Sequence, residues 1–151
     1  MPSTFAPHDH HACIKRALDR AEAGNLRLTP VRRRTLEILL ESHAAMGAYE
    51  ILARLKDDGL GDQPPVVYRA LGYLTEHGLV HRIERLNAFV ACARPDVRHD
   101  PAFLVCRTCR SVAEAISTDP LDGAAGQSGF AIERTVIEAE GLCPDCQARE
   151  P

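Results

Sequence analysis

The spacing of apolar residues changes along this chain, from a helical period in the first half to the alternation of strands after it. In the first half, apolar residues recur every three or four positions, which is the period of an amphipathic helix. This spacing predicts helices over residues 11–23, 32–41, 48–56 and 64–77. Gly24 and Gly78 follow the first and the last of them as stop signals. Thr29-Pro30 supplies the second with an N-cap and a proline at the first helical position.

A hairpin pattern follows directly after the fourth predicted helix. Residues 79–85 and 88–93 alternate between apolar and polar side chains, and Leu86-Asn87 provides a short turn between them. Helices followed at once by a hairpin predict a winged helix-turn-helix, whose last helix lies in the major groove of DNA. The polar, proline-flanked stretch from Pro95 to Pro101 then predicts a linker or hinge.

The remainder of the chain predicts a small second domain of a different kind. Strand patterns cover residues 102–106, 111–116 and 130–138, and a weak helix bounded by glycines covers 119–127. So few elements bury little apolar area, and such a domain generally needs a metal ion or a partner chain. The predicted fold class is therefore α+β, with a winged-helix domain (1–93), a hinge (94–101) and a small α/β domain (102–151).

Two Cys-x-x-Cys pairs in the second domain predict a structural zinc site. Cys106/Cys109 and Cys143/Cys146 supply four thiolates, the number that a closed tetrahedral zinc site needs. The 33 residues between the pairs mean that the metal would hold a whole subdomain at its two ends. The alternative is a redox dithiol, but nothing else in the chain resembles a thioredoxin-type unit.

Composition and charge set further limits. The chain has 151 residues, of which 45% are hydrophobic, and no apolar run approaches the ~20 residues that cross a bilayer. The N-terminus lacks the apolar stretch of a signal peptide, so we expect a cytoplasmic protein whose thiols stay reduced. Residues 1–83 carry a net charge of +1 and residues 84–151 one of −4, which together give −3. This balance excludes a general polyanion binder, but it allows a local basic surface at Arg27, Arg32, Arg33 and Arg34.

Five motifs, taken in order, resemble those of the ferric uptake regulator family. They are RLTPVR (27–32), PPVVYRALGYL (64–74), GLVHRIE (78–84), CRTC (106–109) and IEAEGLCPDC (137–146). Their order and spacing match the family over nearly the whole chain, and their amino-acid sequences are most similar to those of its zinc uptake regulator branch. The resemblance implies a homodimeric, metal-dependent repressor of palindromic operator DNA. It also implies an N-terminal winged helix and a C-terminal α/β dimerisation domain.

A second, regulatory metal site is expected because a closed four-thiolate site binds zinc too tightly to report its changes. The candidate ligands lie across the hinge and match the family's regulatory site position by position: His81, Cys92, His99 and Glu114. One sulfur, two nitrogens and one oxygen suit tetrahedral zinc, and the thiolate disfavours iron or manganese. Two zinc ions per chain follow from this reasoning. Asp96 and Asp100 are nearby alternatives to Glu114.

The fourth predicted helix carries the candidate DNA contacts. Tyr68 and Arg69 lie off its apolar stripe and match the recognition-helix motif of the family. Arginine can form two hydrogen bonds to guanine, whereas tyrosine can contact a thymine methyl group or a phosphate. Arg27 and Arg32 are expected to contact phosphates, which position a protein without specifying sequence. The mechanism predicted is zinc-dependent repression of zinc-import genes.

Three other functions compete with this hypothesis. A sister regulator would use the same scaffold to sense iron, manganese, nickel or peroxide. A hydrolytic zinc enzyme would need an open coordination position, and the chain has no His-Glu-x-x-His or comparable motif, so we expect neither enzymatic activity nor a small-molecule substrate. A zinc-stabilised adaptor would not need the Tyr68-Arg69 pair. The N-terminus holds further residues of types that can bind metal: His8, His10, His11 and Cys13. We expect them to belong to a disordered N-terminal segment rather than to a metal site.

Overall fold

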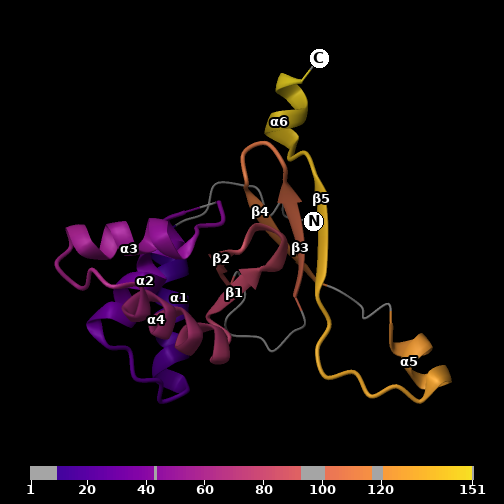
Figure 1. Ribbon diagram of the computed structural model, residues 1–151, viewed down its shortest axis with the longest axis horizontal. Coiled ribbons are helices and arrows are strands. Elements are labelled where there is room, and N and C mark those ends of the chain that lie inside the picture. The colour runs from indigo at the N-terminus through magenta and orange to yellow at the C-terminus, as the bar shows by residue number, and fades with distance from the viewer. Residues whose placement is uncertain (1–9, 43, 93–100, 117–120, 151) are drawn as a thin grey trace.

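The computed structural model describes residues 10–42, 44–92, 101–116 and 121–150. Its first part is helical, and its second part contains a small sheet (Figure 1). The helices of the first part are α1 (His10–Ala23), α2 (Pro30–Glu41), α3 (Ala48–Asp57) and α4 (Pro64–Glu76). All four predicted helices are therefore confirmed, with ends that agree to within two residues.

The apolar stripes of the four helices form one core. Leu36, Ile51, Leu55, Leu71 and Leu74 are fully buried within it. Helices of 10–14 residues are marginal in isolation, so this shared burial is what holds them in place. Gly78 ends α4 with a positive φ of 74°, the left-handed conformation expected from its position after the apolar stripe.

The N-cap of α2 offers a test of this local chemistry. The Thr29 hydroxyl accepts a hydrogen bond from the Arg32 N–H, and Pro30 follows it at the first helical position. Replacing Thr29 by alanine should lower the free energy of unfolding by about 1 kcal/mol, because the Arg32 N–H loses its partner. Chemical denaturation measures this loss. Thr75→Ala, on the exposed side of α4, is the control, and an equal effect of the two changes would contradict the cap.

The wing is a two-stranded antiparallel hairpin that follows α4. Strand β1 (Val80–Ile83) pairs with β2 (Ala88–Ala91), and the 3-10 turn η1 (Glu84–Leu86) joins them. Asn87 completes the turn in the left-handed region, which asparagine tolerates better than most residues. The segment between α2 and α3 adds a second pairing, because Met46 exchanges two backbone hydrogen bonds with Phe89. Helices and wing together form the predicted winged helix-turn-helix.

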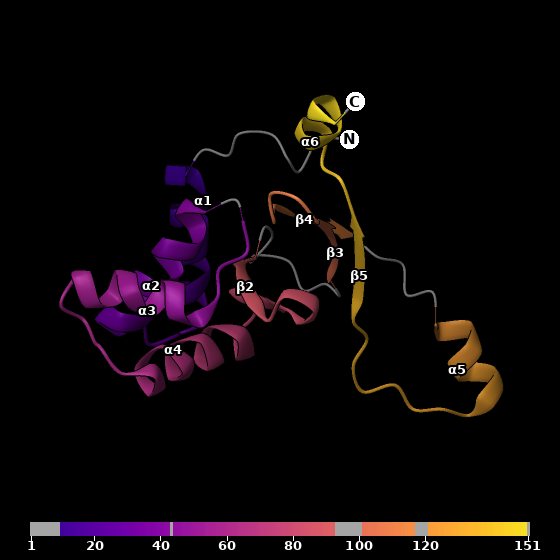
Figure 2. The ribbon, with the colours of Figure 1, turned by 45° about the horizontal axis from the view of Figure 1, so that its top comes forward.

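The second part is built on a three-stranded sheet of order β4-β3-β5. Central strand β3 (Pro101–Cys106) is antiparallel to β4 (Val112–Ile116) and parallel to β5 (Ile137–Gly141). Two short helices complete it: α5 (Asp122–Ser128) and α6 (Pro144–Arg149). In both views α5 lies away from the rest of the chain, and the segment that follows it leads back to β5 (Figures 1 and 2).

The wing lies between the helices and the three-stranded sheet in both views (Figures 1 and 2). A second apolar cluster joins the two parts at this place: Ala45, Ile83, Ala88, Phe103 and Val105 are buried together. A backbone contact reinforces it, because the Ala45 N–H donates to the Arg110 carbonyl at 3.2 Å. The helical part therefore meets the sheet through its wing and through the segment between α2 and α3.

The predicted α+β class is confirmed, but one strand was placed wrongly. The β-branched run suggested a strand over residues 130–138, whereas β5 spans Ile137–Gly141. A strand needs a hydrogen-bonding neighbour, and β3 offers partners only from Ala102 to Cys106, opposite Ile137 to Gly141. Helix α6 was not predicted at all, and most of the predicted hinge, residues 94–100, lies outside the described residues. Within the described ranges no helix is long and apolar enough to span a bilayer.

Candidate metal centres and nucleic-acid interface

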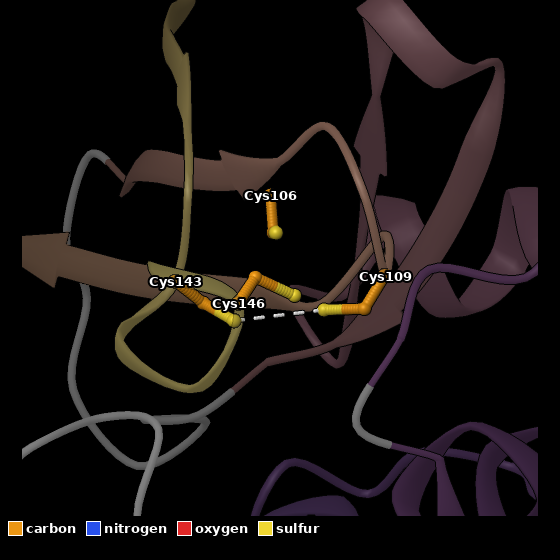
Figure 3. Close-up of side chains that lie close together, drawn as sticks. All are labelled: Cys106, Cys109, Cys143 and Cys146. Atoms are coloured by element: carbon orange, nitrogen blue, oxygen red, sulfur yellow. Dashed lines mark hydrogen bonds between the residues drawn. The ribbon is translucent and has the colours of Figure 1, made fainter. Parts of the chain in front are cut away.

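The four cysteines of the two pairs come together at one end of the sheet. Cys106 ends β3, Cys109 lies in the turn before β4, Cys143 is the N-cap of α6, and Cys146 lies within α6. Their sulfur atoms all lie within 4.8 Å of one another and point into one small space (Figure 3). The Cys109 Sγ–Cys143 Sγ distance is 3.7 Å. Zinc–sulfur bonds of 2.3 Å in a tetrahedron separate sulfurs by about 3.8 Å, so the geometry fits zinc.

The electrostatics of this cluster also favour a cation. Backbone hydrogen bonds from Cys109 lower the pKa of the Cys106 thiol to about 6, so that this group is a thiolate near neutral pH. Hydrogen bonding to Cys143, burial and the Cys106 charge raise the pKa of Cys146 to about 12. Four sulfurs this close cannot all carry a charge unless a divalent ion compensates them. Three of them are buried, and Cys109 is exposed.

Three of the four predicted regulatory ligands also converge. His81 lies on β1, Cys92 follows β2, and Glu114 lies on β4, so the group joins the wing to the sheet. One ligand atom from each residue lies within 4.8 Å of the others. The His81 Nε2–Glu114 Oε1 distance is 3.6 Å, and the Cys92 Sγ–Glu114 Oε1 distance is 3.8 Å. His99 lies outside the described residues, as do the alternatives Asp96 and Asp100.

The surroundings hold this second group in place. The side chain of Glu114 is only 6% exposed and that of His81 only 16%. The His81 ring packs on Phe103, with ring centroids 5.4 Å apart. The Cys92 N–H donates to the Leu79 carbonyl, which fixes the chain directly after β2. A buried imidazole, thiol and carboxylate in contact form a donor set that suits zinc.

The exposed face of α4 presents the two residues predicted to contact DNA. Val67, Ala70, Leu71 and Leu74 point into the core, whereas Tyr68 and Arg69 are exposed. Tyr68 is 49% exposed. The core-facing residues of α4 and the two residues predicted to contact DNA therefore occupy different faces of the helix.

The predicted basic cluster is divided in the structure. Arg32 stacks its guanidinium 3.6 Å from the centre of the Tyr73 ring and donates to the Arg27 carbonyl, while the Arg27 N–H donates to the Tyr73 hydroxyl. Arg32 and the backbone of Arg27 thus lie against α4. Tyr73 was not singled out from the sequence, because its helical spacing gives no sign of this stacking.

Arg33 and Arg34 do not form the basic surface that the sequence suggested. Arg33 pairs with Glu37, and Arg34 pairs with Glu37, Glu41 and Asp58. The hydrogen bond with Asp58 is the main cause that raises the pKa of Arg34. That expectation was wrong for these two residues because helical spacing and the nearby α3 terminus supply them with carboxylates.

Comparison with known proteins now assigns the family. Residues 23–138 match the profile of the ferric uptake regulator family. The chain belongs to this family. The zinc uptake regulation protein of Escherichia coli (strain K12) is 38% identical over 126 residues, which cover 81% of this chain and 74% of that protein. The resemblance found in the motifs is confirmed, and the family consists of transcriptional regulators, not enzymes.

Solved structures of the family distinguish two arrangements of the chain. A zinc uptake regulator complexed with zinc and DNA matches with a TM-score of 0.86 at 33% identity, covering 95% of this chain and 98% of that chain. Holo XcZur matches with a TM-score of 0.81 at 35% identity, covering 91% and 98%. Apo XcZur reaches only 0.54 at 33% identity, covering 92% and 98%. Because the last two are one protein, the difference lies in arrangement, and the arrangement of this chain is more similar to that of holo XcZur than to that of apo XcZur.

Proposed function

We propose that this protein is a zinc-responsive repressor that binds palindromic operator DNA as a zinc-loaded homodimer and thereby represses zinc-uptake genes. We also propose that the protein is cytoplasmic. The observation that carries the proposal is the convergence of His81, Cys92 and Glu114 at the junction of wing and sheet. It is supported by the 38% identity to a zinc uptake regulation protein and by the arrangement shared with holo structures.

The four-cysteine cluster is proposed as a structural zinc site. Cys106 and Cys109 hold the β3–β4 turn, and Cys143 and Cys146 hold the start of α6, so the cluster joins the two ends of the small domain. Among the residues that the structure describes, only Leu142 packs beside these cysteines as a partly buried apolar residue, so little other core from this part of the chain stabilises this end of the sheet. In this proposal the domains are 1–93, the hinge 94–101 and the dimerisation domain 102–151.

The second group is proposed as the regulatory zinc site, with His99 from the hinge as its fourth ligand. Zinc bound there would supply the positive charge that lets the Glu114 carboxylate, the Cys92 thiolate and the imidazoles stay together in a buried place. His81 and Cys92 belong to the wing, and Glu114 belongs to the sheet, so their contact sets the angle between the two parts. Each chain would then carry two zinc ions.

DNA contact is proposed on α4, with Tyr68 and Arg69 reading base edges and Arg27 and Arg32 contacting phosphates. Large apolar side chains of the second part, Leu104, Leu121, Phe130 and Val136, are exposed in a single chain. A second copy of the chain would cover such side chains. A two-fold dimer would place two α4 helices on a palindromic site.

A DNA-binding titration at buffered free zinc tests the proposed function. The affinity for the best operator should rise about a hundredfold as the second zinc ion binds, which takes only ~2.7 kcal/mol of coupling. Iron, manganese and nickel are the competing effectors, and the Cys92 thiolate disfavours the first two. If affinity for the operator does not change with zinc, or if another metal or mild oxidation controls it, a sister regulator replaces this proposal.

The contribution of Arg69 can be measured separately. Arg69→Ala should weaken operator binding by about 1–3 kcal/mol and relax the preference for one base pair, because a bidentate contact to guanine is lost. Fluorescence anisotropy with operator and mismatched duplexes measures both effects. Arg149→Ala, which removes the same charge from the exposed end of α6, is the matched control. Equal losses for the two variants would reject base readout by Arg69.

A further inference from the structure

The turn of the wing is bound by two carboxylates of β5, Glu138 and Glu140, which belong to neither group of metal-ligand residues. Glu138 accepts two consecutive backbone hydrogen bonds, from the Glu84 N–H at 2.6 Å and from the Arg85 N–H at 3.0 Å. These two N–H groups open the 3-10 turn η1, where they lack partners within the turn. A single carboxylate thus satisfies both, with a charge-assisted bond to each.

Two ion pairs flank this contact. The Arg85 guanidinium forms a two-pronged pair with Glu140, at 2.6 Å and 3.0 Å, and this pair raises the pKa of Arg85. Arg134 pairs with Glu84, and its hydrogen bond is the main cause that lowers the pKa of Glu84. We call Glu138, Glu140 and Arg134, together with the turn residues that they contact, the wing clamp.

The register of the sheet places the wing clamp and the regulatory ligands in one row. Phe103 of β3 lies opposite Glu114 on β4 and opposite Glu138 on β5, so all three side chains stand on the same face. Two of them contact the metal end of the wing and the third contacts its turn: Glu114 meets Cys92 and His81, Phe103 packs on His81, and Glu138 caps the turn. The sheet therefore holds both ends of the wing, only one of which is the metal end.

The wing is in turn fixed to the DNA-reading helix. Leu79 follows Gly78 at the end of α4, its N–H donates to the Leu74 carbonyl, and its own carbonyl accepts from the Cys92 N–H. Leu74, Leu79 and Val80 are all buried in the helical core. A wing held at both ends consequently fixes the direction of α4 relative to the sheet, whereas a wing held only at the metal end could pivot about it.

We propose that Glu138 is a positioning residue for DNA binding, which acts through the wing turn, and that the acidic strand rather than DNA is the partner of that turn. This inference rests on the proposed function. The wing clamp supplies part of the angular restraint that a dimer needs to place two α4 helices on one operator. It also brings His81 and Cys92 close to Glu114.

Glutamate-to-glutamine exchange tests the proposal with a matched pair. Glu138→Gln keeps the shape of the side chain but directs an amide towards one N–H group, whereas Glu133→Gln changes an exposed glutamate that makes no ion pair within the described part of the chain. Operator affinity of the zinc-loaded dimer should fall about fivefold to tenfold for Glu138→Gln, from the loss of charge-assisted bonds at a partly exposed site, and not for Glu133→Gln. Zinc content and dimer mass should stay unchanged in both. Equal affinities of the two variants would overturn the proposal.

A charge reversal separates positioning from simple destabilisation. Arg85→Glu and Glu140→Arg should each weaken operator binding, and the double variant should recover to within about twofold, because the pair is restored in reverse. Failure of the double variant to recover, with zinc content and dimer mass intact, would contradict the wing clamp.

Hydrogen exchange gives a measurement that does not involve DNA. The amides of Glu84 and Arg85 should exchange about tenfold faster in Glu138→Gln than in the unmodified protein, because both donate to the carboxylate that this change removes. The zinc-dependent operator binding of the unmodified protein is measured in parallel, so that this result can be compared with the test of the proposed function. If the unmodified protein shows no zinc-dependent operator binding while these amides still respond to Glu138→Gln, the proposed function fails and the contact stands.

Discussion

Replacing Cys143 by alanine is expected to remove the tightly held zinc ion and to dissociate the dimer. Cys143 is buried and lies at the start of α6, so its loss frees the end of the chain from the β3–β4 turn. Structural zinc in small domains contributes on the order of 10 kcal/mol or more, which equals the whole stability of many domains. Zinc analysis, circular dichroism on heating and sedimentation velocity measure the three consequences.

The matched control for this change is Cys92→Ser. It also removes a buried sulfur, but from the regulatory group, so the protein should keep one resistant zinc ion per chain and remain dimeric. A Cys143→Ala protein that keeps its resistant zinc, its melting temperature and its dimer would show that the cluster is not a structural site. A Cys92→Ser protein that loses both ions would show that the two groups are not independent.

Replacing Glu114 by glutamine is expected to abolish the response of DNA binding to zinc. The side chain is almost fully buried, and its carboxylate lies between Cys92 and His81. A neutral amide of the same shape is a poor zinc ligand, so the coupling of ~2.7 kcal/mol between zinc and operator should disappear, a loss of roughly a hundredfold in zinc-dependent affinity. Anisotropy titrations with buffered zinc give this value directly.

Glu133→Gln is again the matched control, and it should retain the full zinc response. The resistant zinc ion should remain in both proteins, because neither glutamate belongs to the four-cysteine cluster. If Glu114→Gln responds to zinc like the control, Glu114 is not a ligand. Asp96 and Asp100 then become the next candidates to exchange.

The elements near the helical core were predictable because local signals and tertiary packing agree there. Thr29 and Gly78 mark helix ends by their own backbone chemistry, and the apolar stripes between them face one shared core. The strand near residue 137 was placed too early, because propensity shows where a strand is possible but only the register with β3 decides where it forms. Helix α6 is short and close to the chain end, so its period was too brief to detect.

The candidate sites were predictable to the extent that residue type reveals chemistry. The spacing of the two cysteine pairs indicates metal binding directly, and the sequence pattern identifies the hairpin in which His81 lies on β1 and Cys92 directly follows β2. Glu138 gave no such sign. It lies at the end of the segment predicted to be a strand, and the backbone N–H groups that it binds precede it in the sequence by 53 and 54 residues. Contacts to a distant backbone leave no trace in residue type, so only the folded chain reveals them.

The segment between α2 and α3 touches both parts of the molecule. On one side Met46 pairs with Phe89 of the wing, and on the other Ala44 and Ala45 meet Ser111 and Arg110, next to the Cys106/Cys109 turn. The segment between α2 and α3 thus links the turn of the sulfur cluster to the winged-helix part through backbone contacts. Loss of the resistant ion is therefore expected to loosen the amides of this segment too, and we expect the chain to unfold on heating as one cooperative unit rather than as two independent lobes.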